Sequence, residues 1–182
     1  MRIIAGKFGG RIIKVPKSKL VRPTTDKNKE AIFNYLENKI DFDESLVCDL
    51  YAGSGSLGFE ALSRGALEVH FVEQNFQIYK NLIDNIESLK VKEETKVFKM
   101  SCIKFSSLKN LPQYDLIIAD PPFFKDDIYK VLNNLIENKF VHENGTIIIE
   151  RSIQTKDEDI KNFKIEPIKK LGDSLIYEFN FS

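Results

Sequence analysis

An acid, two prolines and an aromatic residue follow the apolar run 116–119, as Asp120, Pro121, Pro122 and Phe123. Proline fixes φ and lacks an N–H, so this segment presents hydrogen-bond acceptors in a rigid frame. The Asp120 carboxylate and the Pro121 carbonyl can together accept from one NH₂ group, such as the exocyclic amine of a nucleic-acid base on which Phe123 stacks. The amine nitrogen could then displace a methyl group directly, without a covalent enzyme intermediate. The structural alternative is an ordinary proline turn after a strand.

Three glycines form a second pattern with chemical meaning. Gly53, Gly55 and Gly58 match G-x-G-x-x-G between an apolar strand and a helix, where glycine allows a tight turn and close approach to a ligand. Glu73 follows the next strand, 18 residues after Gly55, where a carboxylate can bind ribose hydroxyls. The pair predicts a nucleoside-bearing cofactor. The alternative is a structural turn and a surface glutamate.

Asp49 distinguishes between the cofactors that such a turn can hold. Its carboxylate stands just before the turn, where it would repel a pyrophosphate and suit the sulfonium and ammonium groups of S-adenosylmethionine. We therefore predict S-adenosylmethionine as the cofactor. The residues assigned to it from the turn and the next strand are Asp49, Tyr51, Ala52, Gly53, Ser54, Gly55 and Glu73.

Composition excludes several classes of protein. Hydrophobic residues make up 42% and charged residues 30% of 182 residues, which indicates a folded globular chain. No apolar run approaches the ~20 residues of a membrane span. No signal peptide is recognised at the N-terminus, and the two cysteines suit reduced thiols, so we expect a cytoplasmic protein. The two histidines lack clustered partners, so we expect no metal site.

Strands and helices alternate from residue 46 onward, which predicts a doubly wound α/β sheet with helices on both faces. A closing hairpin is expected from 163–169 and 175–181, around Leu171–Ser174. The remaining predicted strands are 46–50, 68–72, 95–99, 116–119 and 146–150, and the predicted helices are one beginning near 24–26, then 57–64, 76–89 and 126–138.

Positive charge is concentrated at the start of the chain. Residues 1–30 hold nine basic and two acidic side chains, a net charge of +7 in a chain of net charge zero. We predict two units: a basic hairpin arm over 1–23, in which 2–5 pairs with 11–15, and a catalytic domain over 24–182. The arm's candidate phosphate contacts are Lys7, Arg11 and Lys14. A solvated charged segment is the alternative.

The ordered motifs of the whole chain resemble the RsmD family, the bacterial 16S ribosomal RNA guanine-N2 methyltransferases. Besides the Asp120 motif and the glycine turn, the resemblance rests on MRIIAGKF at 1–8, RPTTD at 22–26, EAIFN at 30–34 and EALSRGA at 60–66. It implies a Rossmann-like, seven-stranded methyltransferase sheet with the last strand antiparallel. It also implies S-adenosylmethionine as donor and 16S ribosomal RNA in a small-subunit particle as substrate.

The resemblance places Ser101 and Cys102 where such folds contact the adenine of the cofactor. Arg22 and Thr24 could line the mouth of the site and hold a phosphate or the target base. A surface arginine followed by a helix cap is the alternative, which we favour for Thr24.

Three other functions remain open. A DNA adenine-N6 or cytosine-N4 methyltransferase fits the core motifs, although the chain lacks an obvious extra domain for reading duplex sequence. A nicotinamide-dependent oxidoreductase fits the glycines but leaves the Asp120 motif unused. A non-catalytic RNA-binding module fits the arm alone. We expect a monomer.

Overall fold

The computed structural model describes residues 1–15, 25–122 and 126–181, and its elements alternate as the sequence predicts. The described helices are α1 Asp26–Leu36, α2 Ser56–Ser63, α3 Phe76–Leu89, α4 Cys102–Ser106, α5 Asp127–Glu137, the 3₁₀ turn Ile153–Thr155 and α6 Lys156–Phe163. The strands are β1 Leu46–Leu50, β2 Glu68–Val72, β3 Thr95–Phe98, β4 Tyr114–Ala119, β5 Val141–Ser152, β6 Lys169–Leu171 and β7 Ser174–Asn180.

The strands form one sheet in the order β3-β2-β1-β4-β5-β7-β6. The first five are parallel, and β7 runs antiparallel between β5 and β6. This is the Rossmann-like sheet that the sequence predicted, with its last strand antiparallel. Apolar runs account for the central strands, because a parallel strand covered by helices on both faces is buried on both.

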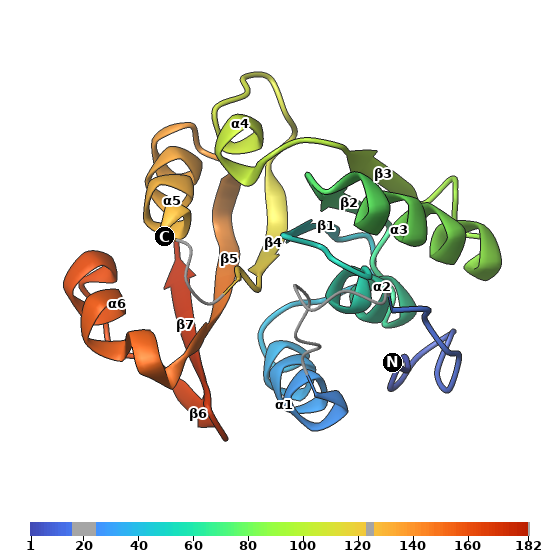
Figure 1. Cartoon of the computed structure of the whole chain (residues 1–182), viewed down its shortest axis with the longest axis horizontal. Helices are drawn as coiled ribbons and strands as arrows, with labels where there is room; N and C mark the ends of the chain where they lie inside the picture. Colours follow the sequence, from blue (N-terminus) through green and yellow to red (C-terminus); the bar gives the residue numbers. More distant parts are fainter. Residues whose placement is uncertain (16–24, 123–125, 182) are drawn as a thin grey trace.

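Each face of the sheet has its own hydrophobic core. Side chains of α1, α2 and α3, such as Phe33, Phe59 and Leu82, pack on one face. Side chains of α4, α5 and α6, such as Phe105, Val131 and Phe163, pack on the other, and the two groups of helices stand apart in Figure 1. The connections leave β1 and β4 for opposite faces, so their carboxyl ends border the crevice where such sheets bind ligands.

One prediction of local structure was wrong, and another was confirmed only in part. The segment that begins at Phe163 does not start as a strand: Phe163 ends α6, and β6 is confined to Lys169–Leu171. The N-terminal arm is a much smaller hairpin than predicted, with a single bridge between Arg2 and Ile12. The arm instead lies against α2 (Figure 1), with Ile3, Phe8 and Ile13 buried in the first core.

A histidine links the amino-terminal ends of the central strands. His142 Nε2 lies 2.7 Å from Asp115 Oδ1, and the Leu46 N–H donates to the other Asp115 oxygen at 2.7 Å. A hydrogen bond to the Glu143 carbonyl, and then the Asp115 carboxylate, raises the pKa of His142 above its usual value.

This raised pKa predicts a pH-dependent stability. Folding favours the protonated form of His142. Its contribution to the free energy of unfolding is therefore complete below the unfolded pKa, near 6.5, and is lost as pH rises through the pKa of the folded state. We expect the free energy of unfolding in urea to fall modestly above about pH 6.5, because both partners are partly exposed. His142→Gln should remove that component; an identical pH profile in the variant would contradict the assignment.

Candidate active site

Glu73, Tyr51 and Asp120 stand in one row at the carboxyl edge of the sheet. The register pairs Leu50 with Val72 on one side and with Ala119 on the other. The next residue of each strand is therefore Tyr51, Glu73 or Asp120. The sequence signals after three separate strands thus meet at a single edge, which is the edge where sheets of this kind bind ligands.

The glycine turn has the backbone conformation that its residues predict. Gly53 and Gly55 have φ values of +57° and +84°, in the left-handed region that favours glycine. A Cβ on Gly55 would lie 2.5 Å from side-chain atoms of Leu82 and Phe59. Gly58 has a different role, because a Cβ there would lie 2.3 Å from the Phe71 ring. The third glycine of the motif therefore allows α2 to pack closely on β2.

Glu73 is hydrogen-bonded to the glycine turn, and both are predicted to bind the same cofactor. One carboxylate oxygen accepts from the Gly53 N–H at 3.1 Å and the other from the Asn75 N–H at 2.7 Å. Each oxygen keeps a second lone pair for a further donor. The carboxylate is buried, so two backbone bonds fix its position before any ligand binds.

Asp49 places a third carboxyl group beneath the same turn. Its carboxylate is buried and accepts from the Gly58 N–H at 2.8 Å. Burial raises the pKa of Asp49 well above its usual value, the Gly58 bond opposes this, and the nearby charges of Asp120 and Glu73 raise it further. Three acids at or just beyond the carboxyl ends of β1, β2 and β4 therefore converge, and a cationic ligand would offset their mutual repulsion.

The structure describes the Asp120 motif as far as Pro122. Asp120 is partly exposed at the end of β4, Pro121 is buried and Pro122 is exposed. Phe123 lies outside the described residues, as do Arg22 and Thr24, so their predicted roles stay predictions.

The same edge of the sheet carries three further residues predicted to bind the cofactor, Tyr51, Ser101 and Cys102, and each makes a hydrogen bond within the protein. The Tyr51 hydroxyl donates to Asp127 of α5 at 3.1 Å, and its backbone has φ +56°. The Ser101 side chain caps α4 by accepting from the Lys104 N–H. Burial raises the pKa of the Cys102 thiol, which disfavours a reactive thiolate.

A buried ionic network holds the N-terminal arm on α2. The Glu60 carboxylate accepts from the backbone N–H groups of Ile4 and Ala5, at 2.7 and 3.2 Å. It also pairs with Lys29 Nζ at 3.6 Å and Arg64 Nε at 3.0 Å. The side chains of Glu60 and Lys29 are both 0% exposed. The arm is therefore part of the folded body.

The predicted phosphate contacts on the arm differ in their surroundings. Lys7 is exposed, and so is Lys14. The Arg11 guanidinium is already engaged, donating to the Ser88 carbonyl at 2.6 Å at the end of α3, where a cation is favourable. The Phe8 ring is buried, which favours its packing role over stacking on a base.

Sequence reasoning missed Asn85 of α3. It is 2% exposed and donates from Nδ2 to the carbonyl of Ser54 in the glycine turn at 3.0 Å. The available signal was a polar residue among the helix's buried positions Ile78, Leu82, Ile86 and Leu89.

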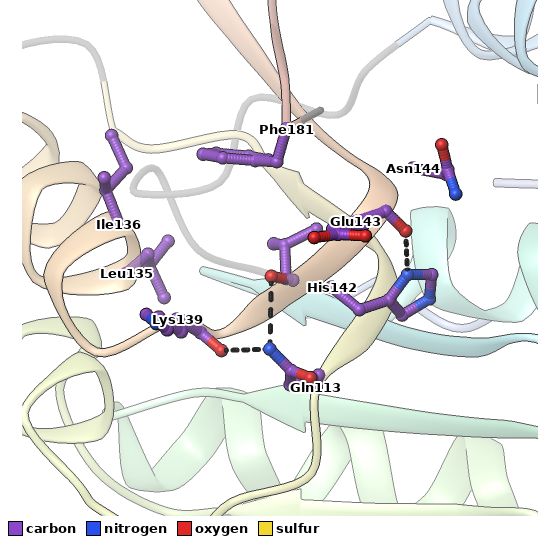
Figure 2. A pocket seen from close by; sticks show the side chains of 9 residues that line it. Gln113, Leu135, Ile136, Lys139, His142, Glu143, Asn144 and Phe181 are labelled. Carbon is purple, nitrogen blue, oxygen red and sulfur yellow. Dashed lines mark hydrogen bonds between the residues drawn. The ribbon is translucent and has the colours of Figure 1, made fainter.

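A half-open cavity of about 680 Å³ lies at the opposite edge of the sheet, near the starts of β4 and β5. Figure 2 shows Leu135, Ile136 and Phe181 on one side of it and Gln113 held by the carbonyl of Lys139. None of the predicted site residues that the structure describes lines this cavity. Within the described residues, no cluster of three or more histidines, cysteines, aspartates or glutamates could hold a metal ion, and no helix has the length and apolar character needed to cross a membrane.

Comparison with known proteins decides the family. The model of the family described as conserved hypothetical protein 95 matches residues 1–180. The chain belongs to this family. It is the RsmD family that the sequence motifs indicated, so that prediction is confirmed.

Two relatives of the RsmD family and one solved structure show how far the likeness extends. The chain is 40% identical over 152 residues to ribosomal RNA small subunit methyltransferase D of Haemophilus influenzae, covering 82% of this chain and 78% of the relative. The chain is 34% identical over 154 residues to the protein of the same name in Escherichia coli K12, and the match covers 85% of this chain and 76% of the relative. A solved Escherichia coli structure, provisionally named a methyltransferase, superposes with a TM-score of 0.81 at 26% identity and covers 100% of this chain and 99% of its own.

Proposed function

We propose that this protein transfers a methyl group from S-adenosylmethionine to the exocyclic N2 amine of a guanine in 16S ribosomal RNA. The observation that carries the proposal is the aligned row of Glu73, Tyr51 and Asp120, because the turn predicted to hold the cofactor and the motif predicted to hold the amine then share one edge of the sheet. Family membership supports the reaction class, and the names of the relatives in the two bacteria support ribosomal RNA as the substrate.

The residues present fit S-adenosylmethionine. Glu73 is fixed where it can accept from ribose hydroxyls, and the left-handed glycines keep side chains away from the methionine part. The convergence of Asp49, Glu73 and Asp120 favours a cation and disfavours the pyrophosphate of a nicotinamide cofactor. When bound, the cofactor supplies an electrophilic methyl group on a sulfonium that leaves as a neutral thioether.

The chain's own contribution is to orient the amine. The Asp120 carboxylate and the Pro121 carbonyl accept the two N–H groups, which turns the nitrogen lone pair out of conjugation and toward the methyl donor. The N–CH₃ bond forms as the S–CH₃ bond breaks, and the nitrogen then loses one proton to Asp120 or to water. Excluding water around the amine strengthens both hydrogen bonds. A paired base must first leave its stack.

Labelled methyl transfer tests the proposal. Protein and methyl-labelled S-adenosylmethionine are incubated with small ribosomal subunits, deproteinised 16S RNA or duplex DNA. We expect label in the RNA of subunits or in free RNA. Label confined to DNA would instead favour the adenine-N6 or cytosine-N4 alternative, and no label in any substrate would contradict methyl transfer.

Glu73→Ala should weaken cofactor binding. The change removes the predicted ribose acceptor and frees the Gly53 N–H, so we expect the Kd for S-adenosylhomocysteine to rise by about ten- to a hundredfold. Calorimetry measures this, with the adjacent exposed Gln74→Ala as control. Equal affinities in the two variants would place the nucleoside elsewhere.

A further inference from the structure

The carbonyl of Ser54 lies in the glycine turn, one residue before the N-cap Gly55 of α2, and so stands outside the hydrogen-bond ladder of that helix. In a continuing helix it would accept from the N–H of Gly58, four residues on. That N–H donates instead to the Asp49 carboxylate at 2.8 Å. The Ser54 carbonyl is satisfied from outside the turn, by Asn85 Nδ2 at 3.0 Å. The shape of the turn therefore depends on a side chain of α3.

The same amide group also binds the N-terminal arm. Asn85 Oδ1 accepts from the Lys14 N–H at 2.9 Å, and Nδ2 donates to the Lys14 carbonyl at 2.9 Å. Two carbonyls and one N–H surround the amide, so only one orientation of its oxygen and nitrogen satisfies all three partners. Neither a carboxylate nor an apolar side chain of this size could do so.

A second contact joins the same two segments. The Ser54 hydroxyl lies 3.8 Å from the sulfur of Met1, while the Met1 carbonyl accepts from the Ile13 N–H at 2.9 Å. Both strands of the arm therefore reach the glycine turn, one through Met1 and one through Lys14. Asn85 is buried, so its side chain has little room to adjust. A displacement of the Lys14 backbone would therefore shift the Asn85 amide and with it the Ser54 carbonyl.

We propose that Asn85 is a positioning residue that couples the N-terminal arm to the cofactor turn. It fixes the Ser54 carbonyl, and hence the conformation of residues 53–55, against the backbone of Lys14. The inference rests on the proposed cofactor and adds that its binding orders the arm. By linkage, RNA that holds the arm in place strengthens cofactor binding by the same factor.

Calorimetry with S-adenosylhomocysteine tests the coupling in the full chain. Asn85→Leu keeps the size of the side chain and removes all three bonds, so we expect the Kd to rise about tenfold. Ser63→Ala is the matched control, because it removes a hydroxyl that accepts from the Phe8 N–H at 2.9 Å and donates to the Ala5 carbonyl, which loosens only a part of the arm that does not contact Asn85. It should keep the Kd within about twofold while lowering Tm.

The outcomes separate this inference from the proposed function. A folded Asn85→Leu variant with wild-type affinity, or a Ser63→Ala variant weakened as much as Asn85→Leu, would overturn the role of Asn85. Failure of the wild-type protein to bind S-adenosylhomocysteine would overturn the proposed cofactor and this inference with it.

Amide hydrogen exchange on the wild-type protein covers the case in which Asn85→Leu does not fold. Adding S-adenosylhomocysteine should slow exchange of the Lys14 amide, whose acceptor is Asn85 Oδ1, together with the amides of the turn. Slower exchange in the turn with an unchanged rate at Lys14 would contradict the coupling.

Discussion

Asp120→Ala should lower kcat for methyl transfer by about a hundredfold or more while leaving cofactor affinity nearly unchanged. Asp120 stands at the end of β4, beyond Ala119, which pairs with Leu50 of β1. The proposed mechanism gives it the task of holding the amine, a contact made to the substrate and not to the nucleoside of the cofactor. Single-turnover methyl transfer and calorimetry with S-adenosylhomocysteine measure the two quantities separately.

Two further variants sharpen this prediction. Asp120→Asn keeps an acceptor oxygen for the amine and loses the negative charge, so it should retain part of the activity that alanine loses. Asp126→Ala removes an exposed acid that makes no side-chain capping bond at the start of α5, and its kcat should match the wild type. Wild-type kcat in Asp120→Ala would show that another group holds the amine.

Glu60→Ala should cost about 3–5 kcal/mol in the free energy of unfolding, because it leaves the buried Lys29 ammonium without its carboxylate. The same change removes the acceptor for the N–H groups of Ile4 and Ala5, so the arm should lose protection from exchange as well. Urea denaturation gives the free energy, and exchange of the amides in 1–15 follows the arm.

The control for the Glu60 substitution is Glu37, because both carboxylates pair with Arg64. Glu37 pairs with Arg64 at 2.7 Å, but its side chain is 49% exposed. Glu37→Gln should therefore change the free energy of unfolding by at most about 1 kcal/mol. Similar costs for the two substitutions would mean that burial of the Glu60 network contributes little.

The parts of the fold that the sequence predicted well are those with a strong local pattern. The bounds 46–50, 68–72 and 76–89 match β1, β2 and α3. The predicted site residues after β1, β2 and β4 meet at one edge, because parallel strands bring their carboxyl ends together.

The missed elements lacked such a pattern. The helix α4 has only five residues, too few to show helical periodicity, and α6 has a mostly charged sequence that ends at Phe163. The predicted strand 146–150 leaves out the first part of β5, where His142, Glu143, Asn144 and Gly145 interrupt the apolar pattern.

The docking of the arm could not be predicted from local sequence at all. Its basic composition suggested a hairpin arm that contacts RNA and gave no sign that Glu60, more than fifty residues away, binds the N–H groups of Ile4 and Ala5. Asn85 accepts a hydrogen bond from Lys14, which is 71 residues away in the sequence. Hydrogen bonds of this kind join segments whose proximity is a property of the finished fold.

Nucleoside analysis of ribosomal RNA tests the central claim most directly. 16S RNA is isolated from cells with and without this protein, digested to nucleosides and analysed by mass spectrometry. The proposed function predicts loss of N2-methylguanosine from 16S RNA, restored by the wild-type chain and not by Asp120→Ala. Unchanged N2-methylguanosine, with loss of a methylated adenine or cytosine in DNA instead, would contradict it.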